Sequence, residues 1–382
     1  MSFLNFLIDF LAELFGSFTA LTWQQVVMWI IGGVLIFLAI KREMEPTLLL
    51  PMGFGAILVN IPFSGAVEQL VDGVLEHGPL TTLFNAGISN ELFPLILFIG
   101  IGAMIDFGPL LSNPKLMFFG AAAQFGIFIT VFFASFFFDI KDAASIGIIG
   151  AADGPTAIVV SQKLGSNFVP AIMVAAYSYM ALVPIIQPPV IKALTTKKER
   201  MIRMPYEPKE VTKLTRILFP IVITVIAGLV APSSVALVGF LMFGNLIREC
   251  GVLNSLSDTA QNVLANLITI FLGITIASQM TAEKFLVPST LLIIGLGLFA
   301  FIFDTAGGVL FAKLVNLFTK KKINPMIGAA GISAFPMSAR VIHKMGLEED
   351  PGNFLLMHTI GVNVSGQIAS VIAGGLILNM FM

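Results

Sequence analysis

The chain has 382 residues, of which 57% are hydrophobic and 11% are charged, whereas soluble domains carry roughly 25% charged residues. The formal net charge of −1 provides no basic surface for nucleic acid, and the single cysteine, Cys250, excludes an intramolecular disulfide and a zinc site of paired cysteines. This is the composition of a protein whose main solvent is a lipid bilayer.

The first 20 residues are expected to form an amphipathic helix that lies in the membrane interface. Phenylalanine and leucine side chains recur at helical spacing from Phe3 to Phe15, while Asp9 and Glu13 fall on the other side. A cleaved signal peptide would have a basic start and a small-residue cleavage site, and neither precedes the first long apolar run. The helix is therefore expected to stay attached.

Long apolar runs follow, of the length that crosses the roughly 30 Å hydrocarbon core of a bilayer. About ten crossings are expected, at residues 22–40, 46–63, 92–112, 116–138, 167–187, 216–231, 233–248, 259–280, 286–318 and 353–381. Two more stretches, at 143–163 and 323–342, are apolar but are interrupted by glycine, proline and polar residues. We expect each of these two to be a broken or re-entrant helical hairpin.

The distribution of charged loops indicates the orientation, because lysine and arginine in short loops favour the cytoplasm. Residues 191–215 form a strongly basic linker, which is expected on the cytoplasmic side together with the lysines at 320–322. The acidic loop around 68–76 fits the outside. The two assignments of loops to membrane sides agree only if one segment between the acidic loop and the linker enters and leaves on the same face of the membrane. The break at 143–163 is the natural candidate.

An internal repeat relates the two halves of the chain. Pro46 through Phe54 resembles Pro232 through Phe240, and Ile149 through Ala152 resembles Ile327 through Ala330, in the same order along the sequence. The opposite orientations expected for the two halves make the repeat an inverted one. Secondary transporters built in this way bind their ion near the midplane of the membrane.

The predicted fold is therefore an all-α polytopic membrane protein, with two inverted repeats of about five membrane segments each. The predicted parts are the interfacial helix at 1–20, a first half at 21–190, the linker at 191–215 and a second half at 216–382.

The break in the first half contains an acid at membrane depth. Asp153 is followed by Gly154 and Pro155, which interrupt a straight helix, and a lone carboxylate in hydrocarbon has to lie in a cavity or against protein. Unwound backbone in such a place offers carbonyl oxygens beside the acid, and a sodium ion binds to oxygen ligands. Asp153 is the leading candidate for an ion ligand, and pairing with a lysine or a loop position is the alternative.

The second break and the helices after both breaks offer neutral oxygens and one cation. Asn324 and Ser333 can provide carbonyl and hydroxyl oxygens, Arg340 lies near the end of the second break, and Tyr179 and Asn363 follow the two breaks. The structural alternatives are the capping of a half-helix for Asn324 and Ser333, an interfacial position for Arg340, and hydrogen bonds between helices for Tyr179 and Asn363.

Other polar residues in apolar sequence are weaker candidates. Asp106 lies near a helix end, and Asp304 precedes Thr305-Ala-Gly-Gly308, where a helix bend would expose it to water. His343 and His358 are isolated and fit structural roles. The sequence has no phosphate-binding glycine loop, nucleophile elbow or pair of acids in a hydrophilic domain, so any energy source is expected on a partner.

Three stretches resemble the beta subunits of the sodium-translocating carboxybiotin decarboxylases, the pumps driven by oxaloacetate, methylmalonyl-CoA, glutaconyl-CoA or malonate. These stretches are Gly150 through Ala157, Asn324 through Arg340, and Asn363 through Gly366. The resemblance extends from about the first crossing to the C-terminus, and the motifs are long and unusual.

The resemblance implies a membrane subunit of a larger pump in a prokaryotic cytoplasmic membrane. A soluble carboxyltransferase loads biotin on a carrier subunit, and the carboxybiotin docks at the cytoplasmic face of this chain. Its decarboxylation takes up a proton and drives sodium outward by alternating access. The implied partners are these two subunits, a small single-span membrane subunit and further copies of this chain, which itself carries no covalent cofactor.

The family's functional residues carry over to positions of this sequence that match its motifs. Sodium is expected at Asp153, Asn324 and Asn363, with Gly328 and Ser333 nearby. The residues expected to act in sodium or proton passage are Asp153, Tyr179, Ser333 and Arg340, with carboxybiotin near Arg340.

Two other classes of protein share some of these features. A stand-alone sodium/proton antiporter or sodium-coupled carboxylate transporter would also have inverted halves and broken helices. A passive membrane anchor for a soluble enzyme would have apolar helices, but it would have no use for an ionised acid within the bilayer.

Overall fold

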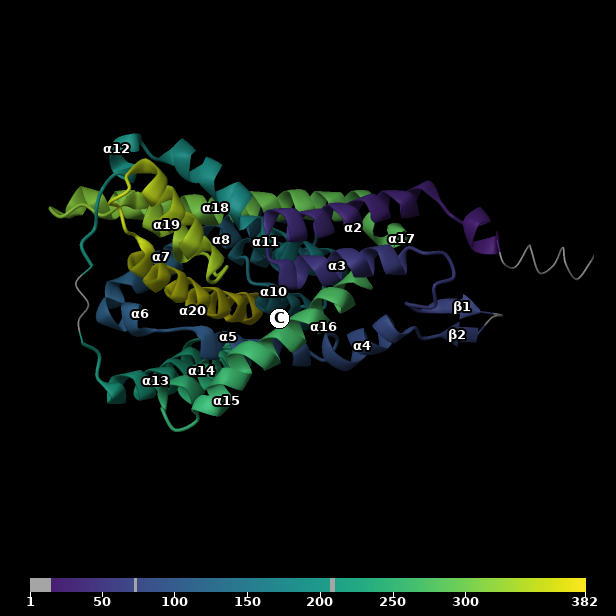
Figure 1. The fold of residues 1–382 in the computed structure, drawn as a ribbon, viewed down its shortest axis with the longest axis horizontal. Helices are drawn as coiled ribbons and strands as arrows, with labels where there is room; N and C mark the ends of the chain where they lie inside the picture. The colour runs from purple at the N-terminus through teal and green to yellow at the C-terminus, as the bar shows by residue number, and fades with distance from the viewer. Residues whose placement is uncertain (1–14, 72–73, 207–209) are drawn as a thin grey trace, which may run out of the picture. The chain divides into compact units, whose positions relative to one another are not determined.

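The computed structural model describes residues 15–71, 74–206 and 210–382, and helices dominate it (Figure 1). The expected interfacial helix lies outside the described residues as far as residue 14. The elements in chain order are α2 (Trp23–Arg42), α3 (Pro46–Val59), β1 (Gln69–Val71), β2 (Val74–Glu76), α4 (Pro79–Gly87), α5 (Leu92–Met104), α6 (Gly108–Ser112), η1 (Pro114–Leu116), α7 (Met117–Ala123), α8 (Phe125–Ala134), α9 (Ile140–Gly147), η2 (Ile148–Ala151), α10 (Gly154–Lys163), α11 (Val169–Leu194), α12 (Lys197–Arg200), α13 (Lys213–Val230), η3 (Pro232–Ser234), α14 (Val235–Glu249), α15 (Asn254–Asp258), η4 (Thr259–Leu264), α16 (Ala265–Ala277), α17 (Ala282–Phe285), α18 (Pro288–Phe318), η5 (Pro325–Gly331), α19 (Met337–Glu349) and α20 (Leu356–Phe381).

Seven helical stretches in the described part of the chain are long and apolar enough to cross a membrane. They are Trp23–Arg42, Pro114–Ala134, Val169–Leu194, Lys213–Val230, Asn254–Ala277, Pro288–Phe318 and Leu356–Phe381. The all-α polytopic class is confirmed, and the chain is a multi-pass protein of the cell membrane.

The other three expected crossings form shorter helices. α3, α5 and α14 have 14, 13 and 15 residues, which span only about 20 to 23 Å at a rise of 1.5 Å per residue. α3 and α5 begin where their apolar runs begin, but they end early, at Val59 and Met104. The backbone leaves the helical conformation at Asn60 and, in an extended form, at Ile105.

The chain folds into two compact units, and each unit takes segments from both halves of the sequence. Unit 1 comprises residues up to Asn90 together with Thr269–Leu291, and unit 2 comprises Glu91–Ile268 together with Leu292–Met382.

In unit 1, α2 and α3 pack closely through glycine. A Cβ atom at Gly32 or Gly53 would lie 2.7 Å from the carbonyl oxygen of the other residue, so a side chain at either position would push the two helices apart. Asn60, directly after α3, fixes the loop before α17: its amide donates to the Met280 carbonyl at 2.7 Å and its oxygen accepts the N–H of Ala282 at 2.8 Å. The acidic loop carries the short antiparallel pair β1–β2, with Gln69 opposite Glu76.

In unit 2, α20 is the helix around which the others pack. Of its 26 residues, 16 are buried, and it contacts α7, α10, α19 and η5. Figure 1 shows α20, in yellow, beside α7 and α19. In α13 only Pro220 and Ala227 are buried, which leaves most of that helix for contact with lipid. Because most of α20 is buried among its neighbouring helices, its polar side chains are shielded from the bilayer.

The helix bend expected after Asp304 is absent. α18 runs without interruption from Pro288 to Phe318, and Asp304 in its middle is fully buried. The glycines after Asp304 serve close packing instead, because the backbones of Gly308 in α18 and Gly328 in η5 touch, and a Cβ on either would overlap the carbonyl of the other. The prediction that Asp304 is exposed to water is therefore wrong.

We expect Gly308→Ala to destabilise unit 2 by about 1 to 3 kcal/mol, since the added methyl group overpacks the contact with η5. The loss should appear as a lower midpoint of thermal unfolding in detergent. Gly295→Ala on the same helix is the matched control, because a Cβ there meets nothing within 4 Å and alanine favours the helix. Equal midpoints for the two variants would contradict the close approach of α18 and η5.

Candidate ion site

Asp153 takes its position from the local structure of the first break. η2 continues from α9 and ends at Ala151, and the next residue, Ala152, has the left-handed φ of 52° before the chain turns into α10. Asp153 is the N-cap of α10 and accepts the N–H of Thr156 at 3.3 Å, while Pro155 occupies the first turn, where no N–H is needed. The sequence Asp-Gly-Pro-Thr thus begins a helix inside the bilayer and holds its acid at the break.

The carboxylate of Asp153 is surrounded by hydroxyl and amide groups. Its Oδ2 accepts from the hydroxyls of Thr156 at 2.8 Å and Ser370 at 2.9 Å, and from the amide of Gln367 at 3.3 Å. Asp153 is only 3% exposed, and it forms no ion pair with a described residue. The acid is therefore shielded from water and lacks a cationic side chain, although a buried charge requires compensation.

The second break meets the first one directly. The N–H of Ser333 donates to the Ala151 carbonyl at 3.0 Å, and the amide of Asn363 donates to the carbonyls of Ala330 and Ile332 at 3.1 and 2.7 Å. The Ser333 side chain also lies near Asp153, although its Oγ forms no well-aligned hydrogen bond with a described residue. The Asn363 Oδ1 is likewise buried without such a partner. Both atoms are oxygens with free lone pairs.

One face of α20 brings these groups together. Asn363, Gln367 and Ser370 are spaced four and three residues apart, so they lie on one side of the helix. Asn363 reaches the second break, while Gln367 and Ser370 reach Asp153 of the first. Sequence reasoning missed Ser370, although the spacing of polar residues in the last crossing is a signal that would have found it.

Further side chains satisfy the unwound backbone of η5. The Gln187 amide donates to the Ala329 carbonyl at 2.9 Å, and Ser338 bonds both that carbonyl and the Gln187 oxygen. The Gln124 amide donates to the Gly331 carbonyl at 3.2 Å. These bonds hold η5 in place at a depth where water is not available to replace them.

Asn324 lies at the other end of η5 and is not brought to Asp153. Its amide donates to the carbonyls of Arg200 and Ile202 in the linker, at 2.7 and 3.0 Å, and its oxygen caps η5 at Met326. The seven residues of η5 correspond to about 14 Å at the rise of a 3-10 helix.

Tyr179 and Arg340 are also not among the described residues that hydrogen-bond the carboxylate of Asp153. The Tyr179 hydroxyl donates to the Ile294 carbonyl of α18, and its ring stacks near Phe301. Arg340 is exposed in the first turn of α19, and its guanidinium makes no hydrogen bond or ion pair with a described residue. Tyr177, two residues before Tyr179 on α11, lies closer to the acid along the break, because its ring packs against Gly154.

The basic linker is bound to the ends of α18, α19 and the start of α20. Arg200 pairs with Glu349 at 2.6 Å, Lys313 pairs with Glu199 at 3.1 Å, and Arg203 forms two bonds to Asp350, at 2.6 and 2.8 Å. Because Asn324 bonds the same linker, the linker is physically connected to the second break.

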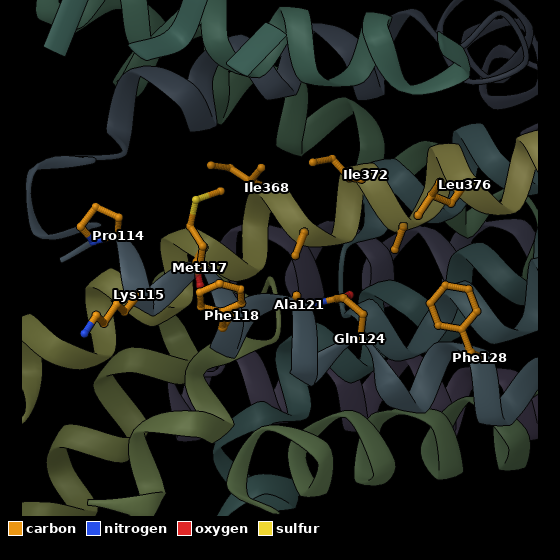
Figure 2. Close-up of a pocket in the computed structure, with 13 residues that line it drawn as sticks. Pro114, Lys115, Met117, Phe118, Ala121, Gln124, Phe128, Ile368, Ile372 and Leu376 are labelled. Carbon is orange, nitrogen blue, oxygen red and sulfur yellow. The ribbon is translucent and has the colours of Figure 1, made fainter. Parts of the chain in front are cut away.

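A groove of about 620 Å³ in unit 2 lies between α7, α8 and α20 (Figure 2). Its lining is almost wholly apolar, including Phe118, Phe128, Ile368 and Ile372, and Gln124 is one of its few polar residues. Such a lining offers few oxygen ligands to a sodium ion, and Asp153 is not part of it.

Known proteins resemble the chain over nearly its whole length. A family model described as "Na+-transporting oxaloacetate decarboxylase beta subunit" matches residues 24–381. The methylmalonyl-CoA decarboxylase subunit beta of Propionigenium modestum is 49% identical, and the match covers 96% of this chain and 97% of that one. The oxaloacetate decarboxylase beta chain of Klebsiella pneumoniae is 46% identical over 93% and 94% of the two chains.

A third relative, the glutaconyl-CoA decarboxylase subunit beta of Acidaminococcus fermentans, is 49% identical over 96% of this chain and 95% of its own. The three relatives are named for three different acids, and all three are beta subunits. What this chain shares with all of them is therefore the membrane subunit and not a particular acid.

The linker contact yields a prediction on pH. The hydrogen bonds from Arg203 lower the pKa of Asp350 from 3.8 to about 2. Because the folded-state pKa is depressed, the stabilisation is present above pH 3.8 and is lost as the pH falls through about 2. Pepsin cleavage of the linker should therefore be slow at pH 4 and accelerate toward pH 2.

Arg203→Gln removes the partner of Asp350, so it should raise the cleavage rate most at pH 4, and its difference from the native chain should shrink toward pH 2. The difference between the variant and the native chain separates this contact from the other ion pairs of the linker. Arg248→Gln is the control, because Arg248 bonds the carbonyls of Ala103 and Met104 and not the linker. A native linker cleaved as fast as that of Arg203→Gln at pH 4 would refute the prediction.

Proposed function

The chain belongs to the family of Na⁺-transporting decarboxylase beta subunits, membrane subunits that couple decarboxylation to sodium transport, and we propose that Asp153 binds the transported sodium ion where its two helix breaks meet. The observation that carries this proposal is the buried carboxylate itself, which is 3% exposed and has hydroxyl and amide neighbours instead of a cationic partner among the described residues. A small cation supplies the missing positive charge.

The neighbours of Asp153 suit sodium because they offer oxygen. The Ser333 Oγ and the Asn363 Oδ1 are buried oxygens without a hydrogen-bond partner in the described structure. The hydroxyls of Thr156 and Ser370 can rotate, so that each turns a lone pair toward a cation while remaining beside the carboxylate. Without sodium, the same carboxylate can take a proton, so one site can exchange the two ions.

The remaining candidates fit positions along the path of the ion. We infer that Asn324 acts at the linker end of η5, where its oxygen can meet an ion that travels between the linker face and Asp153, and that Gly328 acts in the middle of η5. Tyr179 and Ser333 are proposed to act in the passage of sodium or protons. The exposed guanidinium of Arg340 is proposed to attract the carboxylate of carboxybiotin.

The family is biotin-dependent, and its beta subunits work with biotin carrier and carboxyltransferase subunits. We propose that carboxybiotin docks at the linker face of this chain, loses CO₂ and takes up one proton at the freed ring nitrogen, while sodium moves outward. A small single-span membrane subunit and further copies of this chain are the other proposed partners.

Inverted repeats and re-entrant breaks are proposed as the basis of alternating access. In support, α2 and α3 recur in sequence order as α13 and α14, and the break formed by α9, η2 and α10 recurs as η5 and α19. The hydrogen bond between Ser333 and Ala151 joins the two breaks where they meet.

Neither alternative class is favoured. The relatives are subunits of decarboxylases, which argues against a stand-alone antiporter or carboxylate transporter. A passive anchor would not require a carboxylate that is held at a helix break by three side chains.

We expect Asp153→Asn to raise the sodium concentration needed for half-maximal decarboxylation at least about tenfold, since a charged contact in a buried site contributes about 1.5 to 3 kcal/mol. The measurement is decarboxylation of the carboxylated biotin carrier by the reconstituted complex over a range of sodium concentrations. Asp142→Asn is the matched control, because Asp142 is a buried acid of the same segment that binds the loop at Ser166 and Asn167. An unchanged sodium dependence in Asp153→Asn would contradict the proposed sodium site.

A reversible cross-link tests alternating access. Cysteines in place of Ala152 and Ala334, in a chain with Cys250→Ser, flank the hydrogen bond between the breaks. Oxidation should reduce sodium flux in proteoliposomes to background, and reduction should restore it, because the proposed release of the ion needs the breaks to separate. Each single-cysteine chain is the control. Full flux through completely cross-linked protein would rule this motion out.

A further inference from the structure

Asp304 is a second buried acid at membrane depth, and the proposed function does not use it. It lies in the middle of α18 and is fully buried. Its Oδ1 accepts the N–H of Ile127 at 3.1 Å, and the backbone of Gly126 also hydrogen-bonds the carboxyl. Asp304 therefore caps the start of α8, where α7 ends at Ala123 and the helix begins again.

The second oxygen of Asp304 points to the first break. Oδ2 is buried and has no hydrogen-bond partner among the described residues. It lies against the backbone of Gly150, so closely that a Cβ at Gly150 would overlap it. Gly150 precedes Asp153 by three residues in the same break, so both acids border the break that carries the proposed sodium ligand.

The charged groups around Asp304 do not include a cation that could neutralise it. Neither α8 nor η2 contains a titratable side chain, Asp153 follows η2 by two residues, and Tyr179 of α11 stacks near Phe301 of α18. On α18 the nearest charged residue is Lys313, nine residues away, and it pairs with Glu199. An ionised carboxylate at this depth without a counter-charge is costly, so Asp304 has to bind a proton or a cation.

The partners of the two acids differ in kind, and this difference decides between a proton and sodium. Asp153 has hydroxyl neighbours, which can present oxygen to a cation. The hydrogen bonds to Asp304 come from backbone N–H groups, which repel a cation, and its free oxygen faces a glycine. A proton needs only one oxygen, whereas sodium needs several.

We propose that Asp304 is a proton-binding residue beside the first break, distinct from the sodium ligand Asp153. The step is the addition of one proton from water to Oδ2, which gives a neutral carboxylic acid and requires no other reactant. The inference rests on the proposed function only in assigning sodium to Asp153. The protein would then hold a proton at Asp304 whether Asp153 carries sodium or a proton.

The test is infrared spectroscopy of the complex in lipid bilayers, in the region where a buried protonated carboxyl absorbs. In the native protein without sodium, we expect the band of Asp304 together with that of Asp153. Saturating sodium should remove the contribution of Asp153 and leave one protonated carboxyl per chain. This titration needs no variant, and a loss of the entire band on addition of sodium would overturn the proposal.

Variants assign the band that resists sodium. Asp304→Asn should abolish it, while the new side chain keeps an oxygen to accept the N–H of Ile127 and so preserves the cap. Asp153→Asn should leave it in place. Asp106→Asn, at a half-exposed acid paired with Arg216, is the control and should change nothing. Persistence of the band in Asp304→Asn would refute the assignment.

The two proposals fail in different ways. If Asp153→Asn keeps the native sodium dependence while the band still disappears in Asp304→Asn, the proton site stands and the sodium assignment falls. If Asp153→Asn loses the sodium dependence but Asp304→Asn keeps the band, the sodium site stands and the proton site falls.

Discussion

The constraint on which the rest of the structure depends is that unwound backbone within a bilayer must find hydrogen bonds inside the protein. η5 and the residues after it leave four successive carbonyls, from Ala329 to Ile332, that need donors. Amide side chains from three other helical segments provide them, namely Gln124, Gln187 and Asn363. These bonds fix the second break to α11, α20 and the junction of α7 with α8. A break that would be unstable alone is thereby held in one position, and the helices around it are held with it.

The same side chains can support the backbone and still present oxygen atoms. An amide has donors on nitrogen and an acceptor on oxygen, so a side chain whose N–H groups bind the backbone still presents its oxygen. Asn363 does this beside Ser333, and its Oδ1 is left without a partner among the described residues. Gln187 differs, because Ser338 binds its oxygen. The arrangement therefore distinguishes an amide that only supports the break from one whose oxygen remains available.

The sequence revealed the breaks but not the full set of their neighbours. Gly154-Pro155 and the prolines at both ends of the second break were sufficient to locate the interruptions. Asp153 stood out because burying an acid within an apolar run costs free energy, so such an acid marks a functional site. The contacts of Ser370 and Gln124 were missed, because each joins residues more than 200 positions apart and depends on helix packing. Asn324 was grouped with Asp153 because both lie in breaks, yet the length of η5 separates them. Three of the expected crossings form helices shorter than their apolar runs, since an apolar run alone does not show where the backbone leaves the helical conformation.

Packing also accounts for the small residues around Asp153. Gly150 touches Asp304, and Gly154 lies under the ring of Tyr177, so neither position has room for a side chain. Ala151 and Ala152 are fully buried, and the Ala151 carbonyl bonds the second break. In the motif Gly-Ala-Ala-Asp-Gly, other parts of the protein pack against the backbone on several sides. Asp153 is its one polar side chain, and the other four residues are glycine or alanine. The backbone around Asp153 is thus closely surrounded by other residues. The contact between the two breaks is therefore also what confines the surroundings of this carboxylate to small residues.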